Sequence, residues 1–503
     1  MIINYKLLDD EVFFGGAIND GIYMPFDKET TYEIDMNIWH SGNQASALIF
    51  SNKGKIYYSV RPMKIKFEKG NLTLDGHDIK EYQSDVPTIQ GTHKYICNHI
   101  FKECKSYPDL AFFEHPQFNT WIEMEWDCTE KKVLNYAKKI TSNGYGGGIL
   151  MIDDCWCEDY GVWEFDKKKF AHPKKMMETL HNLGFKVMLW VCPYISPDSK
   201  VYRELEPLGY LLKNSKGETY ISHWWNGYSA VLDLTNPEAV KWIEGQFDYL
   251  MKEYGVDGFK LDACDPEWYY GDTKFMNSED ISSQATIWCE IGEKYDLAEL
   301  RVGFNNGISS CAHRLRDKRH SWDEEGLNTL IPDAILEGLM GYPYLCPDMI
   351  GGGMVPDFHN EGFHFDQELF VRYAQVSAMF PMMQFSLAPW KCLSKKNQAI
   401  VLEAVELHRS YYPTIVEAVK KAVDGTPIVR SVAYQTNDDK YASIMDEFFL
   451  GDDILVCPQV KKEKSRSITI PEGTWIDELG NTYEEGTYTI KTPLNRIPVF
   501  KRK

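Results

Sequence analysis

The sequence predicts an α/β protein in which a (β/α)8 TIM barrel is flanked by an N-terminal β-sandwich and a small C-terminal β-domain. Three observations support this prediction. The 503 residues are too many for one hydrophobic core. The middle of the chain alternates helical segments with short apolar strands, the order that builds a parallel sheet. Both ends carry short alternating segments instead, so we expect domains at residues 1–115, 116–415 and 416–503.

The first region, residues 1–115, has an all-β pattern. Segments such as KIYYSV (55–60) and MKIKFEKGNLTLDG (63–76) alternate apolar with polar residues, and Gly, Asn and Asp separate them. Alternation bounded by such turn residues is typical of antiparallel strands. Several short strands of this kind favour a β-sandwich.

The middle region carries helix and strand patterns in turn. Three helical patterns, at 130–145, 173–184 and 236–255, each precede an apolar strand: GGILMIDD, KVMLWVCPY and VDGFKLDAC. Further strand-like segments follow in LRVGFNN, PYLCPDMIGG and FPMMQFSLAP. A region of this length with this order is typical of an eight-stranded barrel with insertions.

The last region returns to β structure. SVAYQT (431–436), the segment 441–460 and SRSITIPEGTWIDELG (465–480) predict hairpins of a small C-terminal β-domain.

Charge and composition exclude several classes of function. The net charge is −20 at pH 7 with no basic stripe, so a nucleic acid partner is not expected. The N-terminus lacks a secretory signal pattern, and no apolar run is long enough to span a membrane. The twelve cysteines include one C-x-C pair, Cys155 and Cys157, and no second pair, so they predict free thiols and a cytoplasmic location rather than a zinc site.

Polar residues collect at the ends of the predicted barrel strands. The carboxyl ends of barrel strands converge on one pocket, so residues far apart in sequence are expected to meet there. A single Asp after a strand is also a common helix cap or turn former, and that interpretation stays open for each residue alone. The residues concerned are Asp153, Asp154, Asp262, Arg301, Asp348, Gln384 and Ser386, with Trp156, Trp190, Trp225, Trp268 and Trp322 nearby.

Paired carboxylates together with aromatic rings indicate glycoside hydrolysis. One acid protonates the departing oxygen while another attacks the sugar or activates water. Aromatic faces stack on sugar rings.

Long motifs then resemble glycoside hydrolase family 31. The segment MIDDCWCEDYGVWEFDKKKFAHPKKMMETLHNLGFKVMLWVCPYISPDS resembles the core of that family's barrel. WWNGYSAVLDLTNPEAVKWI resembles its W-P-G…D-F-T-N-P…W segment, and PDMIGGG resembles its D-I-G-G turn. The resemblance covers about residues 120–390 in the family's order.

The resemblance implies a retaining exo-α-glycosidase that needs no cofactor and no metal. Within GFKLDACDP, Asp262 matches the family's nucleophile, and Asp317 in RDKRHSW matches its acid/base. Arg301 stands sixteen positions before Asp317, where the family has a substrate-binding Arg. Asp153 matches the residue that binds hydroxyls of the terminal sugar, and Asp348 matches the Asp of the D-I-G-G turn, behind the sugar.

Departures from the family pattern favour galactose over glucose. The family's R-x-H strand end is here Gln384-Phe385-Ser386, its Trp two residues before the nucleophile is Lys260, and G-D-N is R-D-K. IDDCW is similar to the D-D-G-W of related α-galactosidase families, and Lys260 is similar to their K-x-D. The short interval between Asp262 and Asp317 also resembles a branch of the family that contains an α-galactosidase. Charged partners suit an axial hydroxyl, although Lys260 could instead pair with Asp265.

These interpretations define the expected site and its substrate. We expect an oligosaccharide or glycoconjugate with a terminal α-linked sugar, most simply galactose, as the partner. The predicted catalytic residues are Asp262 and Asp317, and the predicted substrate-binding residues are Asp153, Asp154, Trp190, Trp225, Lys260, Arg301, Trp322, Asp348, Gln384 and Ser386.

Other functions remain as alternatives. An α-glucosidase, an α-xylosidase or an α-N-acetylgalactosaminidase would use the same two carboxylates. A non-catalytic sugar-binding protein on the same scaffold is a distant alternative, because a fold does not fix a function. A metal enzyme is weaker still, because His93, His99, His359 and His364 show no H-x-x-x-H spacing.

Overall fold

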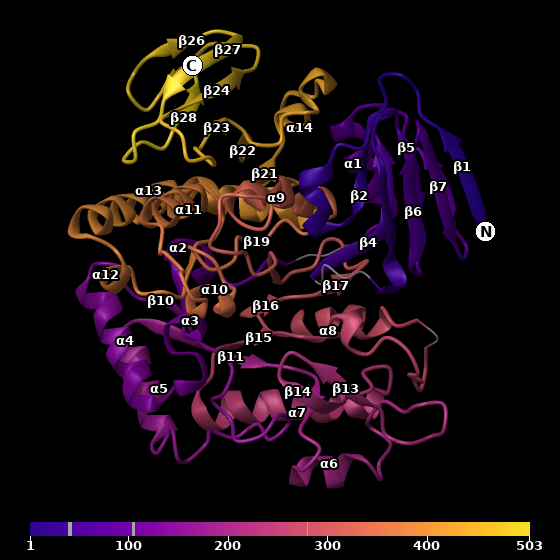
Figure 1. Ribbon diagram of the computed structural model, residues 1–503, viewed down its shortest axis with the longest axis vertical. Coiled ribbons are helices and arrows are strands. Elements are labelled where there is room, and N and C mark those ends of the chain that lie inside the picture. The colour runs from indigo at the N-terminus through magenta and orange to yellow at the C-terminus, as the bar shows by residue number, and fades with distance from the viewer. Residues whose placement is uncertain (39–42, 103–105, 279) are drawn as a thin grey trace.

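A computed structural model describes residues 1–38, 43–102, 106–278 and 280–503, and its centre is a parallel barrel (Figure 1). Eight parallel strands neighbour one another in the order β19-β18-β16-β15-β11-β10-β9-β20, and a bridge between Met349 and Gln384 joins the two ends. The predicted barrel is therefore confirmed. Its strands are β9 (Gln117–Asn119), β10 (Gly148–Ile152), β11 (Phe185–Val191), β15 (Gly258–Leu261), β16 (Ala298–Leu300), β18 (Ala312–Arg314), β19 (Leu345–Cys346) and β20 (Gln384–Phe385).

The barrel strands are apolar because both of their faces are buried. Residues 149–152 of β10 and 187–191 of β11 are almost fully inaccessible to solvent. Parallel strands covered on both sides characteristically carry continuous apolar runs. Asp153 and Asp262 stand directly after two of these strands, at their carboxyl ends.

Helices surround the barrel, and their ends follow from local sequence. In α7 (Pro237–Tyr254), the Asn236 side chain accepts a hydrogen bond from the amide of Glu238, and proline occupies the first turn. The helix ends at Gly255, whose φ of 73° suits glycine. The other long helices are α4 (Glu130–Ser142), α5 (Pro173–Asn182), α8 (Ser283–Gly292), α9 (Leu330–Leu339), α11 (Gln367–Ala378) and α13 (Lys395–Lys421).

The N-terminal region contains two β-sheets, as predicted, but it also contains helices. One sheet has the order β1-β7-β6-β3; in the other, β17-β4-β5-β8, strand β2 also pairs with β4. Strand β17 (Gly303–Phe304) comes from the barrel segment and joins the two regions. The strands are β1 (Ile2–Lys6), β2 (Phe13–Ala17), β3 (Tyr32–Asp35), β4 (Gln44–Ser51), β5 (Lys55–Tyr58), β6 (Met63–Glu68), β7 (Asn71–Gly76) and β8 (Lys80–Gln83).

The expectation that residues 1–115 are all-β is therefore wrong, because two helices follow the sandwich within this range. Helix α1 (Ile89–His99) follows the sandwich. Thr88 caps it by accepting a hydrogen bond from the amide of Gly91, and Ile89, His93 and Ile96 are buried at helical spacing. The short α2 (Ala111–Glu114) then leads into the barrel.

The C-terminal region forms a six-stranded sheet, β21-β22-β23-β28-β25-β26, and a two-stranded antiparallel sheet of β24 and β27. The predicted strand in SVAYQT is wrong, because the Ser431 side chain caps a short helix, α14 (Val432–Thr436). None of the helices in the described ranges is both long enough and apolar enough to cross a membrane. The strands are β21 (Val429–Arg430), β22 (Phe448–Leu450), β23 (Ile454–Val456), β24 (Ser465–Ile470), β25 (Trp475–Asp477), β26 (Thr482–Tyr483), β27 (Gly486–Lys491) and β28 (Val499–Arg502).

Candidate active site

A cavity of about 450 Å³ opens at the carboxyl ends of the barrel strands. Carboxylates, cations and indole rings line it together, and such pockets at this end of a barrel are where barrel enzymes carry out chemistry. Eight of the twelve predicted site residues line this cavity: Asp153, Asp154, Trp190, Trp225, Lys260, Asp262, Arg301 and Asp317.

Asp262 follows β15 directly and is held at the base of the cavity. Its Oδ2 accepts a hydrogen bond of 2.7 Å from Trp190 Nε1, and its Oδ1 lies 3.8 Å from both Arg301 and Arg314. Burial alone would raise the pKa of Asp262. The positive charges of Lys260 and the two arginines outweigh burial and lower this pKa to about 2. Asp262 is therefore an ionised carboxylate with one oxygen, Oδ1, that makes no hydrogen bond to the described residues.

Asp317 stands across the same two guanidinium groups. Its Oδ2 lies 3.5 Å from Arg301 Nη1, and its Oδ1 accepts a short hydrogen bond from Arg314 Nη1. Its side chain is 25% exposed against 10% for Asp262, so it lies nearer the opening. Burial raises the pKa of Asp317, but the two arginines outweigh it and lower this pKa below its usual range.

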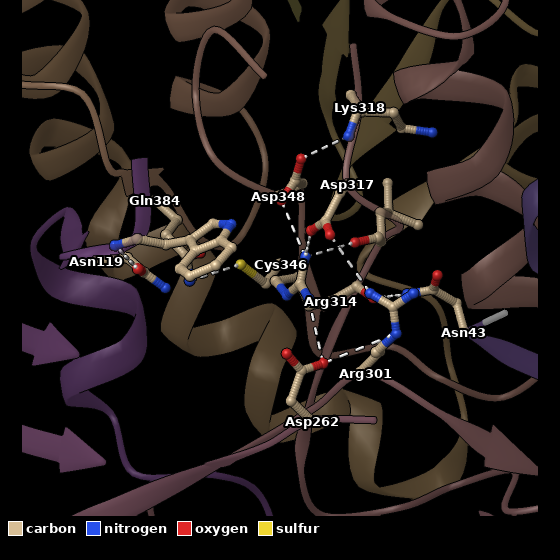
Figure 2. A network of polar contacts seen from close by, with 12 residues as sticks. Asn43, Asn119, Asp262, Arg301, Arg314, Asp317, Lys318, Cys346, Asp348 and Gln384 are labelled. Atoms are coloured by element: carbon tan, nitrogen blue, oxygen red, sulfur yellow. Dashed lines mark hydrogen bonds and ion pairs between the residues drawn. The ribbon is translucent and has the colours of Figure 1, made fainter. Parts of the chain in front are cut away.

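Figure 2 shows Asp262, Asp317 and Asp348 pointing toward Arg314. Arg314 ends β18 and is only 1% exposed. Besides the two carboxylates of the cavity, it contacts Asp348 at 3.0 Å and Glu299 at 3.4 Å. Asp348 is fully buried and lies behind the cavity rather than in its lining.

A second charged group occupies the floor near β10 and β15. Lys260 Nζ lies 2.6 Å from Asp153 Oδ2, and both side chains are 4% exposed. The partner of Lys260 is thus Asp153 and not Asp265, which pairs with Arg301 at 2.9 Å. Asp154 Oδ2 accepts hydrogen bonds from Asn226 at 2.7 Å and Tyr160 at 3.0 Å.

The surroundings of Asp154 weaken its acidity. Burial raises the pKa of Asp154 to about 6, and the adjacent Asp153 adds to the rise. The cavity is therefore lined by two carboxyls after β10. Asp153 has an oxygen that is ion-paired with Lys260, and Asp154 has an oxygen that belongs to a hydrogen-bonded network. Both kinds of group bind sugar hydroxyls well.

Besides Asp348, three predicted residues lie outside the cavity lining. Trp322 Nε1 donates to Asp366 Oδ2 at 3.0 Å. Gln384 is fully buried inside the barrel, where its Nε2 donates to Glu299 Oε2 at 2.8 Å. Ser386 Oγ accepts a hydrogen bond of 2.7 Å from the amide of Ile122, which places it under α3 (Trp121–Met124).

The sequence analysis missed several residues that the structure places in the cavity. Arg314 is the most important of them, and Asn226, Trp121, Trp126 and Met354 also line the cavity. The only sequence signal for Arg314 is its position three residues before Asp317. Among the described residues, no group of three or more His, Cys, Asp or Glu side chains is arranged to hold a metal ion.

Known domains match most of the chain. The TIM-barrel domain of glycosyl hydrolases family 31 matches residues 116–418, and the C-terminal domain of the same family matches residues 425–503. This chain belongs to glycosyl hydrolases family 31. The family resemblance seen in the sequence motifs is therefore confirmed.

Relatives within family 31 differ in the activities that their names give. The myogenesis-regulating glycosidase of Mus musculus is 33% identical over 413 residues, which cover 80% of this chain and 57% of that protein. Alpha-glucosidase 2 of Bacillus thermoamyloliquefaciens is 25% identical over 409 residues, covering 74% of this chain and 50% of that protein. The chain thus spans little more than half the length of these two relatives.

A solved structure confirms the family 31 fold along the whole chain. The family 31 dextranase of Flavobacterium johnsoniae, complexed with glucose, superposes with a TM-score of 0.86 at 20% identity. The match covers 100% of this chain and 66% of the dextranase.

Proposed function

We propose that this chain is a retaining, exo-acting α-glycoside hydrolase that releases a terminal α-galactose. The main support for the proposal is that Asp262 and Asp317 line one cavity and that both carboxylates contact Arg301 and Arg314. Retaining glycosidases need two carboxyl groups on the scissile bond, one as nucleophile and one as acid/base.

Asp262 has the properties of the nucleophile. Its lowered pKa keeps it ionised, and its Oδ1 has no hydrogen-bond donor among the described residues, so this oxygen is available to attack the anomeric carbon. The indole of Trp190 fixes the other oxygen and orients the carboxylate. Attack forms a covalent glycosyl-enzyme with inverted configuration.

Asp317 is placed as the acid/base near the cavity opening. It protonates the departing glycosidic oxygen, and in the second step it takes a proton from the water that displaces Asp262 and restores the α-configuration. In the free site its two arginines favour the ionised form. A bound sugar excludes water from this carboxyl, and desolvation favours the protonated form that the first step needs.

The charges of the cavity favour a neutral sugar. Each of its three cations already contacts a carboxylate: Lys260 pairs with Asp153, Arg301 with Asp265, and Arg314 with Asp348. A sulfonated or carboxylated sugar would compete with these pairs instead of meeting an uncommitted cation. A relative named sulfoquinovosidase, from Escherichia coli, is 22% identical over 488 residues, so this distinction is relevant here.

Galactose is supported by the pair of aspartates after β10 and by Lys260. The Lys260 ammonium can donate a hydrogen bond to an axial hydroxyl and the carboxylates can accept one from it, in agreement with the sequence similarity to α-galactosidase motifs. The second candidate is an α-glucosidase or α-xylosidase. It is favoured by the alpha-glucosidase relative and by the fold shared with a family 31 α-xylosidase, which has a TM-score of 0.85 at 20% identity.

Hydrolysis of nitrophenyl α-galactoside, α-glucoside and α-xyloside tests the proposal. We expect release from the α-galactoside by the wild-type protein, and loss of at least a hundredfold in Asp262→Ala and Asp317→Ala, the usual effect of removing such groups. Azide should restore turnover in Asp262→Ala with a β-configured glycosyl azide, and in Asp317→Ala with an α-configured one, because only the second variant retains the first displacement. Cleavage of the α-glucoside alone would contradict galactose. Cleavage of none of these three substrates, nor of nitrophenyl α-N-acetylgalactosaminide, would contradict the hydrolase itself.

We also propose that the protein is located in a reducing compartment, such as the cytoplasm. All cysteines in the described ranges are free thiols, and most of them are buried. Such thiols persist in a reducing environment.

A further inference from the structure

Two carboxylates converge on a single nitrogen atom. Arg314 Nη1 donates to Asp317 Oδ1 and also to Asp348 Oδ1, the latter at 3.0 Å (Figure 2). Asp348 is fully buried, and the side chain of Asp317 is 25% exposed. Two negative charges held on one donor in a buried site repel each other, so a proton on one of them is favoured.

The backbone holds Asp348 in this position. Its φ is 69°, a left-handed conformation that is uncommon outside glycine and that turns its side chain toward Arg314. Its Oδ2 accepts a hydrogen bond of 2.8 Å from the amide of Lys318. A Cβ on Gly353 would lie 3.0 and 3.1 Å from the two carboxyl oxygens, so glycine leaves them their space.

The surroundings assign the proton of the free site to Asp348. Burial and the ionised Asp317 raise the pKa of Asp348 to about 7, and Arg314 only partly offsets this rise. Three other titratable side chains interact with Asp348: Tyr373, whose hydroxyl donates to the carbonyl of Pro347, Cys346 and Lys318. Asp317 faces Arg314, Arg301, Asp262 and Lys260, and the arginines outweigh its burial and keep it ionised.

We propose that Asp317 and Asp348 hold one shared proton around Arg314, and that Asp348 is a positioning residue that keeps this proton available to the acid/base. This inference rests on the proposed hydrolase function. Asp348 does not touch the sugar and acts through Asp317.

The proton balance of each step is complete. In the free site the proton is on Asp348. When a sugar covers Asp317, the proton moves to Asp317, and ionised Asp348 keeps its bonds to Arg314 and to the amide of Lys318. Asp317 then gives the proton to the departing oxygen as the bond from Asp262 to the sugar forms. In the second step water supplies a hydroxyl to the sugar, its proton returns to Asp317, and the bond to Asp262 breaks.

The variant Asp348→Asn tests this role through two substrates and the pH profile. Removal of the negative neighbour lowers the pKa of Asp317, so less of the acid is protonated at neutral pH. We expect kcat/KM for an α-linked galactosyl disaccharide to fall about tenfold at neutral pH. The basic limb of its pH profile should move to lower pH by about one unit, since one pKa unit is a tenfold change. Turnover of α-galactosyl fluoride, whose leaving group needs no proton, should change less than about twofold on the same scale.

The control variant is Asp357→Asn. Asp357 is a buried Asp on the short helix α10 (Val355–His359), where it pairs with Arg319 at 2.7 Å and does not line the cavity. We expect it to leave the basic limb in place. Equal losses on both substrates with an unmoved limb in Asp348→Asn would overturn the proposal, because they indicate a purely structural role.

An infrared titration keeps the inference testable if Asp348→Asn does not fold. In the wild-type protein we expect the infrared band of a buried, protonated carboxyl. This band should disappear as the pH rises through about 7, the pKa of Asp348, and the pH at which it disappears should shift in Asp317→Asn. Absence of any such band near neutral pH would overturn the shared proton. This readout does not depend on turnover, so it also separates failure of this inference from failure of the hydrolase proposal.

Discussion

Lys260 Nζ donates to Asp153 Oδ2 at 2.6 Å, and each of the two side chains is only 4% exposed. Lys260 lies on β15 and Asp153 directly after β10, two strands that are separated in the barrel by β11. A buried ion pair of this kind is costly to assemble and costly to break, because removal of one partner leaves the other charge uncompensated. The pair therefore fixes the floor of the cavity and supplies two charged groups to a sugar.

Replacement of Lys260 alone should destabilise the protein more than replacement of both partners. We expect Lys260→Met to lower the free energy of unfolding by about 3–5 kcal/mol, since Asp153 is then buried without its cation. The double variant Lys260→Met, Asp153→Asn should recover a large part of that loss. Urea unfolding of the two single variants and the double variant measures the coupling, and simple additivity would contradict a tightly coupled pair.

Trp190 adds to the lowering of the Asp262 pKa that Lys260, Arg301 and Arg314 produce. Its Nε1 donates to Asp262 Oδ2 at 2.7 Å, and a hydrogen bond to a charged group contributes about 1.5–3 kcal/mol. Trp190→Phe should therefore raise the nucleophile's pKa from about 2 by roughly one unit or more. Since Asp262 must be ionised, the acidic limb of kcat/KM moves to higher pH.

A matched control for this variant is Trp163→Phe. Trp163 is 2% exposed, and its Nε1 has no hydrogen-bond partner within the described part of the chain. It loses a similar volume without losing a hydrogen bond, so its acidic limb should stay in place. An equal shift in both variants would indicate a general effect of repacking.

The site residues at the strand ends could be predicted because a buried apolar strand is easily recognised in the sequence, and so is the residue at which it ends. The apolar run before Asp153 is continuous and the one before Asp262 is interrupted by Lys260, so the first carboxylate after each run marks the mouth of the barrel. The same argument fails for Gln384. It lies within β20 and not after it, so its side chain points into the barrel toward Glu299.

Arg314 could not be predicted because the sequence offers two equivalent arginines. HRLRD places Arg314 and Arg316 two positions apart, and alternation alone does not tell which of them faces the cavity. In the structure Arg314 ends β18 and is buried, whereas the side chain of Arg316 is 23% exposed and lies 3.8 Å from Glu325. Trp322 was equally uncertain, since the path of its loop depends on contacts with Asp366 far along the chain.

Trp225 should contribute to binding of the leaving group. It lines the cavity, is 38% exposed, and Arg301 lies over its ring at 5.1 Å. Trp225→Ala should lower kcat/KM for a disaccharide about tenfold, which corresponds to ~1.4 kcal/mol of lost stacking. The same variant should leave hydrolysis of α-galactosyl fluoride nearly unchanged, because fluoride has no ring to stack.

Tyr228→Ala is the control for the hairpin that carries Trp225. Tyr228 lies on β14 (Gly227–Val231), is 66% exposed and is not part of the cavity lining. Hydrolysis of both substrates should be unaffected. Equal losses on both substrates in Trp225→Ala would place its effect on the catalytic centre rather than on the leaving group.

Arg314 should stabilise the fold in a pH-dependent way. It contacts Asp317, Asp348 and Glu299, and Arg314→Met would leave these carboxylates buried with less positive charge. Their pKa values then rise in the folded state. An acid whose folded pKa is raised loses stability as pH increases through that pKa, so the variant should be least stable at neutral pH and recover under mildly acidic conditions. We expect the free energy of unfolding to fall by about 3–5 kcal/mol at neutral pH, as measured from unfolding curves across this pH range.

Arg430→Met is the control, because Asp452, the partner of Arg430, is 48% exposed and stays hydrated. The loss of stability in this control should be smaller and should depend little on pH. A loss in Arg314→Met that is independent of pH would contradict the charge network as the source of its effect.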